Sequence, residues 1–414
     1  MKMDKILINN WLWRIAQIVF KQGTIALIFF IGAKNLSIEE FGLYNYLLAI
    51  IMATVMFSDF GISTSTAKYV SEYKTNNKEK IKHVLMSAGI LVISAALICS
   101  LILLFIIKDK FMENYIAIIG LIPLIILIPL TALYDGIYRG LEEFRKLSII
   151  SIVISIISIP LIIVLISKYT LIGAIISQSL FYLLLFIGLT LGHKENELKI
   201  KKEIIQEIGK YSLAYGVAVF GNFLFIKAGI ILLGSYGYLR EIATYQVINQ
   251  FFSILLLPFI LFGQVIAPNF VKLKINNNLK KILLETKKYT KYSFIIGIII
   301  TLLLYITLPK LIFLFLPKYY DPLFLKIFPA MCLIFMFNTW AATIDAGIIV
   351  PTGYAKMMSK IYLLLGIIGF IACAISIKIL GFMGVIYTFV FSSLLMVLIL
   401  RFSFIREISK LVNK

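Results

Sequence analysis

Long runs of apolar residues without a charged side chain recur along the whole chain and limit its fold more than any other feature. Val84–Ile107, Leu147–Ser167 and Ile379–Leu400 are three such runs. A helix of about 20 residues spans a bilayer core about 30 Å thick. The chain is 61% hydrophobic and 14% charged, whereas soluble domains are nearer about 45–50% and 25%. A water-soluble globular fold is therefore excluded.

Twelve membrane spans are expected, and all should be helices because an isolated strand leaves its backbone groups unsatisfied in lipid. Their expected ranges are 11–33, 41–62, 84–107, 115–138, 147–167, 170–191, 209–234, 242–267, 292–315, 323–350, 360–378 and 380–402.

Basic residues predict the orientation of these spans. Most lysines and arginines lie in the expected loops 68–83, 139–146, 194–210 and 272–291 or at the two termini. Loops rich in lysine and arginine remain in the cytoplasm, so both termini are expected there. The same distribution explains the net charge of +20 as a topology signal, and no nucleic-acid partner is expected.

Two weak internal matches predict a pair of related halves. Glu40 and Tyr44 are separated from Glu241 and Tyr245 by the same number of residues, and Asp135 has a similarly spaced counterpart further along the chain. We therefore expect six-helix bundles over 1–191 and 209–414, with a cytoplasmic linker over 192–208. Parallel halves of this kind place a central substrate cavity between them. The predicted fold class is an all-α integral membrane protein built from two pseudo-symmetric bundles.

The segments Leu36–Tyr44 and Ser58–Ile62 resemble the opening of the polysaccharide-transport flippases. These proteins include the O-antigen flippases of the multidrug/oligosaccharidyl-lipid/polysaccharide exporter superfamily. Glu241–Tyr245 resembles the matching element of the second half. The resemblance implies alternating access and a substrate built on a polyprenyl diphosphate. Twelve spans, against the fourteen usual in lipid II flippases, favour the oligosaccharide branch.

The first span carries charges at an unusual depth. Arg14, Gln17, Lys21 and Thr24 share one helical face, and Lys21 lies about 15 Å into the span. A charge there is costly unless it faces water or a partner. We expect Arg14 and Lys21 to bind the substrate diphosphate, and the alternative is a structural ion pair. Lys227 interrupts the seventh span and is assigned the same role, with an interfacial lysine as its alternative.

Acidic and amide side chains supply further candidates. Asp59, Asp135 and Asp345 come late in spans two, four and ten. They are candidates for a gate with Arg14 or Arg139, for binding a coupling cation, or for ordinary capping and ion pairing. Sugar hydroxyls suit uncharged amides, which makes candidates of Gln17, Gln246, Asn249 and Gln250. Helix–helix contacts inside a bundle use the same groups.

No catalytic motif, metal-ligand spacing or nucleotide-binding loop is present in the sequence, so neither enzymatic activity nor a cofactor nor a metal is expected. Transport then draws its energy from a Na⁺ or H⁺ gradient, or from consumption of the substrate on the far side.

The leading interpretation is a flippase in a bacterial cytoplasmic (inner) membrane. It would move an undecaprenyl-diphosphate-linked oligosaccharide to the outer leaflet for surface polysaccharide assembly. Expected partners are membrane lipids, a polysaccharide polymerase and glycosyltransferases. One alternative is a cation-coupled multidrug exporter of the same superfamily, whose substrates prefer an acidic or aromatic cavity. The other is a membrane glycan polymerase, which the short outer loops disfavour.

Overall fold

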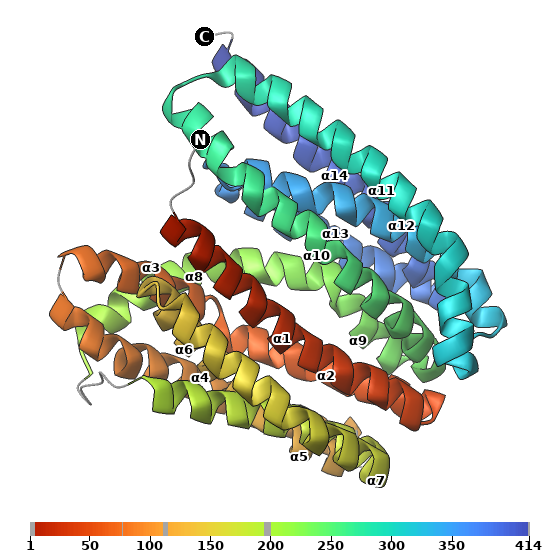
Figure 1. The fold of residues 1–414 in the computed structure, drawn as a ribbon. Helices are drawn as coiled ribbons and strands as arrows, with labels where there is room; N and C mark the ends of the chain where they lie inside the picture. The colour runs from red at the N-terminus through yellow and green to blue at the C-terminus, as the bar shows by residue number, and fades with distance from the viewer. Residues whose placement is uncertain (1–4, 77, 111–114, 194–199, 413–414) are drawn as a thin grey trace. The chain divides into compact units, whose positions relative to one another are not determined.

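The computed structural model describes residues 5–76, 78–110, 115–193 and 200–412. Within these ranges the chain is almost entirely helical and contains no strand (Figure 1). It divides into two compact units, Met1–Val219 and Phe220–Lys414. The boundary lies inside a helix, after the linker that the sequence placed at 192–208. Residues 194–199 of that linker lie outside the described ranges.

Unit 1 contains seven complete helices and the first part of an eighth. They are α1 (Lys5–Asn35), α2 (Ile38–Asp59), α3 (Ile62–Asn76), α4 (Lys78–Lys110), α5 (Tyr115–Leu121), α6 (Pro123–Gly140), α7 (Phe144–Gly192) and α8 (Lys202–Ile226).

Unit 2 contains the end of α8 and the helices that follow it. These are α9 (Ala228–Ser235), α10 (Leu239–Ile275), α11 (Leu279–Phe315), the short 3₁₀ turn Pro317–Tyr319, α12 (Pro322–Ile344) with the π-helical turn Asp345–Ile349, α13 (Ala355–Leu380) and α14 (Phe382–Val412).

The number of spans approaches the predicted twelve. Ten helices of the described ranges are long and apolar enough to cross a membrane, and the bent pair α8 and α9 adds an eleventh. Helix α7 has 49 residues but is not helical at Thr170 (φ 44°, ψ −117°). Gly188 and Gly192, after this break, lie against Ile150 before it, so α7 folds back on itself as two helices. The all-helical membrane fold is confirmed.

Two of the predicted loops are wrong. The region 68–83 is mostly helical, because α3 continues to Asn76 and α4 begins at Lys78. The region 272–291 is helical as well, apart from a turn between Ile275 and Leu279. Lysine favours helices almost as strongly as leucine does, so these helices continue beyond their apolar segments. Hydropathy detects only the segment that suits lipid.

The segment Leu36–Tyr44, which resembles the opening of the polysaccharide-transport flippases, has a clear local role because it starts α2. The Glu40 backbone N–H donates to the Ser37 hydroxyl at 3.1 Å, and the Ser37 backbone N–H donates to the Glu40 carboxylate at 2.8 Å. This reciprocal pair satisfies backbone donors that the first helical turn leaves free. Phe41 is fully buried and packs edge-on against Phe29 at 4.9 Å between ring centroids, which joins α2 to α1.

Two glycines let α6 approach α3 closely. A Cβ atom on Gly136 would lie 2.5 Å from the Ser63 carbonyl oxygen, and one on Gly140 would lie 2.6 Å from the Val70 Cβ. Small residues four apart commonly form such contacts between membrane helices. The packing fixes the end of α6, which carries Asp135 and Arg139.

Candidate functional site

An ionic cluster in unit 1 brings together residues from α1 and α6. Asp135 accepts from Arg14 Nη1 on Oδ2 at 2.7 Å, and its Oδ1 lies 2.7 Å from Arg139 Nε. Gln17 donates to Asp135 Oδ2 at 3.4 Å and accepts from Arg14 at 2.8 Å. We call Arg14, Gln17, Asp135 and Arg139 the Asp135 cluster. Its carboxylate pairs with both arginines that the sequence named as gate partners.

Lys21 lies beside this cluster without joining its ion pairs. Its side chain is half-buried, and its ammonium lies 5.8 Å from the centre of the Tyr182 ring on α7. Within the described ranges, no acidic group forms an ion pair with Lys21 at 4.0 Å or less. It does interact electrostatically with Asp135 and with both arginines. Three cations thus surround one carboxylate, and the group carries a net positive charge.

Local sequence and packing explain the geometry of the cluster. Arg14 and Gln17 are three residues apart on α1, and Asp135 and Arg139 are four apart on α6, so each pair shares a helical face. The Ser148 hydroxyl on α7 donates to the Trp13 carbonyl, which anchors the start of α1. Helix α1 packs mainly along α7. The arginines therefore approach one carboxylate from two helices whose positions are fixed by packing.

Asp59 caps the start of α3. Its carboxylate accepts from the Ser63 backbone N–H at 3.1 Å and from the Ser63 hydroxyl. Ser63 belongs to the first turn of α3, where backbone donors lack partners within the helix. Asp59 interacts electrostatically with Arg139 but forms no ion pair with it within 4.0 Å. The direct contacts of Asp59 are therefore those of a helix cap, which was one of the alternatives from the sequence.

In unit 2, Lys227 lies at the junction between α8 and α9, where the helix axis bends by 49°. The sequence predicted a charged residue within the seventh span at this position, but it did not predict a bend of the helix. The Lys227 side chain is half-buried. Acidic groups of the described ranges form no ion pair with it at 4.0 Å or less.

The predicted amides of α10 lie together. Gln246 is buried and accepts from the Asn249 side-chain amide at 3.5 Å, and Gln250 is half-buried. A small pocket of about 60 Å³ is lined by polar groups of Tyr245, Asn249, Asn338, Ser392 and Ser393, together with apolar Ile334 and Phe389. A space of this volume can hold ordered water.

Three of the polar residues that line this pocket were not predicted. Asn338 is an amide in an apolar stretch of α12, and Ser392 and Ser393 are adjacent hydroxyls in α14. Polar residues inside apolar spans were the available signal. Serine is so common in membrane helices that only the packing of α10, α12 and α14 distinguishes these serines from others.

Asp345 begins the π-helical turn Asp345–Ile349, a local widening that is frequent at functional sites. The Tyr362 hydroxyl donates to its Oδ2 at 2.6 Å. Its buried Oδ1 has no hydrogen-bond partner in the described part of the chain, and no lysine or arginine described there forms an ion pair with it. Asp135 and Asp345 both lie near the C-terminal ends of their spans, but only Asp135 is neutralised by cations.

The family model described as "Polysaccharide biosynthesis protein" matches residues 7–274. The comparison with curated proteins gives no match.

Among solved structures, the eukaryotic MATE transporter AtDTX14 is similar with a TM-score of 0.70 and 15% identity, over 97% of this chain and 96% of that one. The lipid II flippase MurJ, in an inward closed conformation, is similar with a TM-score of 0.70 and 18% identity, over 96% of this chain and 87% of that one. A MOP superfamily transporter from Pyrococcus furiosus is similar with a TM-score of 0.59 and 12% identity, over 98% of this chain and 96% of that one. At these identities the likeness shows the fold. Since the family model covers more than half of the sequence, the chain belongs to the polysaccharide biosynthesis protein family.

Proposed function

We propose that the protein is a flippase that moves an undecaprenyl-diphosphate-linked oligosaccharide from the cytoplasmic to the outer leaflet. The observation that carries this proposal is the excess positive charge around Asp135. Arg14, Arg139 and Lys21 share one carboxylate inside a membrane-spanning unit. Such a group attracts a diphosphate and repels an organic cation.

The Asp135 cluster provides a means of holding its cations before the substrate arrives. A single carboxylate keeps both guanidinium groups positioned and reduces the cost of their burial. An arriving diphosphate offers more acceptor oxygens and more negative charge than this carboxylate. We propose that the diphosphate takes over contacts from Asp135 and engages Lys21 as an additional donor. A lysine binds as a point charge without the bidentate grip of arginine, which favours release after transfer.

Asp345 is the proposed coupling residue. Its carboxylate has one hydroxyl donor and one buried oxygen without a partner among the described residues. A bound Na⁺ or a proton would neutralise this charge, because an unpaired carboxylate is costly to bury. An ion gradient acting on this site would drive alternating access. The proposal includes no cofactor.

A cation-coupled multidrug exporter is the second candidate. Asp345 is the observation that favours it, because an acid without a cationic partner attracts organic cations as well as metal ions. The excess positive charge in unit 1 argues against this candidate. The two functions require substrates of opposite charge, so transport assays distinguish them.

The test uses purified protein in liposomes of defined composition. A fluorescent undecaprenyl-diphosphate-linked oligosaccharide is placed in one leaflet, and a membrane-impermeant quencher reports its arrival in the other. We expect faster exchange than in protein-free liposomes and no accumulation of a fluorescent organic cation under a Na⁺ or H⁺ gradient. Exchange at the protein-free rate, combined with accumulation of the cation, would favour the exporter.

A further inference from the structure

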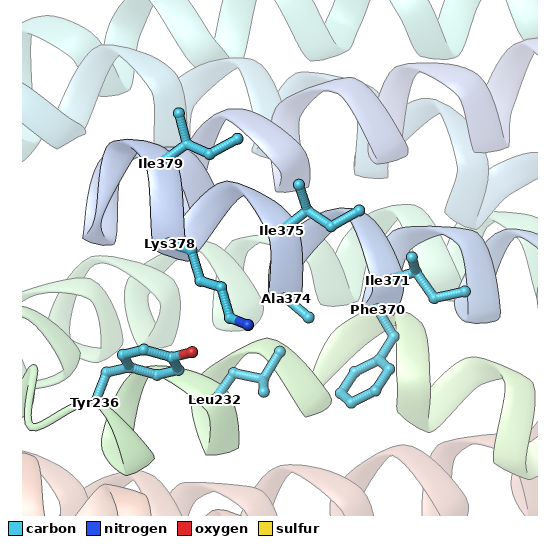
Figure 2. Close-up of a pocket in the computed structure, with 8 residues that line it drawn as sticks. All are labelled: Leu232, Tyr236, Phe370, Ile371, Ala374, Ile375, Lys378 and Ile379. Atoms are coloured by element: carbon cyan, nitrogen blue, oxygen red, sulfur yellow. The ribbon is translucent and has the colours of Figure 1, made fainter.

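A groove on unit 2 lies between α9 and α13, and it shares no lining residue with the pocket among α10, α12 and α14. Its volume is about 530 Å³. The lining residues are Leu232 and Tyr236 on the α9 side and Phe370, Ile371, Ala374, Ile375, Lys378 and Ile379 on α13 (Figure 2). Most of the lining is apolar, and one end carries an amine and a phenol hydroxyl.

The apolar part of the groove is exposed. Ile371, Ile375 and Ile379 are 52%, 55% and 73% exposed, and their spacing of four places them along one side of α13. The stripe extends over about 12 Å. On a membrane-spanning helix, such exposed side chains contact acyl chains. Ala374 leaves room between the helices because its side chain is small.

The polar end of the groove lies where both helices end. Helix α9 ends at Ser235 and α13 ends at Leu380, next to Tyr236 and Lys378. Figure 2 shows the Lys378 ammonium and the Tyr236 hydroxyl near one another in the space between the helices. Tyrosine is enriched at the membrane–water interfaces of membrane proteins. Acidic groups of the described segments form no ion pair with Lys378 at 4.0 Å or less.

We propose that this groove binds one glycerophospholipid with an anionic headgroup. Lys378 and Tyr236 donate to its phosphate, and an acyl chain lies along Ile371 and Ile375. A single ammonium balances one phosphate charge but leaves a diphosphate mostly uncompensated. The groove therefore suits a membrane phospholipid better than the lipid-linked substrate proposed above. The inference does not depend on that proposed function.

Native mass spectrometry of the full-length protein tests this site. The probes are phosphatidylglycerol, phosphatidylcholine and undecaprenyl diphosphate, each added at the same ratio to protein in detergent. Replacing exposed Lys378 with glutamine should weaken the tightest phosphatidylglycerol binding about fivefold. Ala374→Phe should weaken it as well, because the ring fills the groove. Lys310→Gln is the matched control, since it removes an exposed lysine near the end of α11, and it should leave binding unchanged.

The expected order for the wild-type protein is phosphatidylglycerol above phosphatidylcholine, with a difference that disappears in Lys378→Gln. Equal binding of phosphatidylglycerol by Lys378→Gln and Lys310→Gln would overturn the proposal. Undecaprenyl diphosphate that displaces phosphatidylglycerol from the wild-type protein, but not from Lys378→Gln, would also overturn it by assigning the groove to the substrate. Neither outcome depends on whether the protein flips lipid.

Discussion

Asp135 and Asp345 occupy similar places in their spans but have different polar neighbours. Two guanidinium groups contact Asp135, whereas Asp345 has one tyrosine hydroxyl and a buried oxygen without a partner in the described ranges. The sequence suggested that the two acids were related but could not show this difference, because Arg14 lies far from Asp135 along the chain. Their substitutions should therefore have different effects.

Replacing Asp135 with asparagine should destabilise the protein. The change leaves two arginines and Lys21 close together without a compensating charge, and breaking a buried pair costs about 3 kcal/mol or more. Thermal unfolding followed with a thiol-reactive dye is a suitable measurement, because Cys332 and Cys373 are buried. The wild-type protein and Asp59→Asn serve as references. Equal unfolding temperatures for Asp135→Asn and the wild type would show that the ion pairs contribute little.

Asp345→Asn is expected to leave the unfolding temperature unchanged or to raise it. An asparagine side chain still accepts from Tyr362 and removes a charge that the described residues do not neutralise. The same variant should make transport insensitive to an imposed Na⁺ or H⁺ gradient. Transport that responds to the gradient as in the wild type would remove Asp345 from the coupling mechanism.

At the scale of helices, the sequence identified the spans but not their ends. Apolar length located the spans, but the sequence did not predict the break between α8 and α9 at Lys227. The lysine-rich parts of α3, α4, α10 and α11 were interpreted as loops because they contain no apolar signal. The pocket formed by Asn338, Ser392 and Ser393 also remained hidden, since it depends on which faces of three helices meet.

The close packing of α6 against α3 gives a prediction at this scale. Gly136→Ala places a Cβ atom 2.5 Å from the Ser63 carbonyl oxygen, so the helices must separate, at a cost of about 1–3 kcal/mol. Gly23→Ala on α1 is the matched control, because its Cβ would meet no atom within 4 Å. Alanine there should stabilise the helix slightly. Comparison of the two unfolding temperatures tests the packing, and equal values would contradict it.

For the whole molecule, the basic residues predict that both termini are cytoplasmic. Reporter fusions after Lys202 and Lys281 should give a cytoplasmic signal. A fusion after Tyr238, in the turn between α9 and α10, should report the outside. A cytoplasmic signal at Tyr238 would mean that α8 and α9 do not cross the membrane together.

The most direct test of the proposed function is the flipping rate of Lys21 variants in liposomes at matched protein density. Lys21→Ala should lower the rate of lipid-linked oligosaccharide exchange at least about tenfold, because a charge-assisted contact to the diphosphate is lost. Lys21→Arg should keep part of the activity. Lys168→Ala, which removes an exposed lysine near the break in α7, should exchange substrate like the wild type. Wild-type exchange by Lys21→Ala would contradict diphosphate binding by the cations beside Asp135.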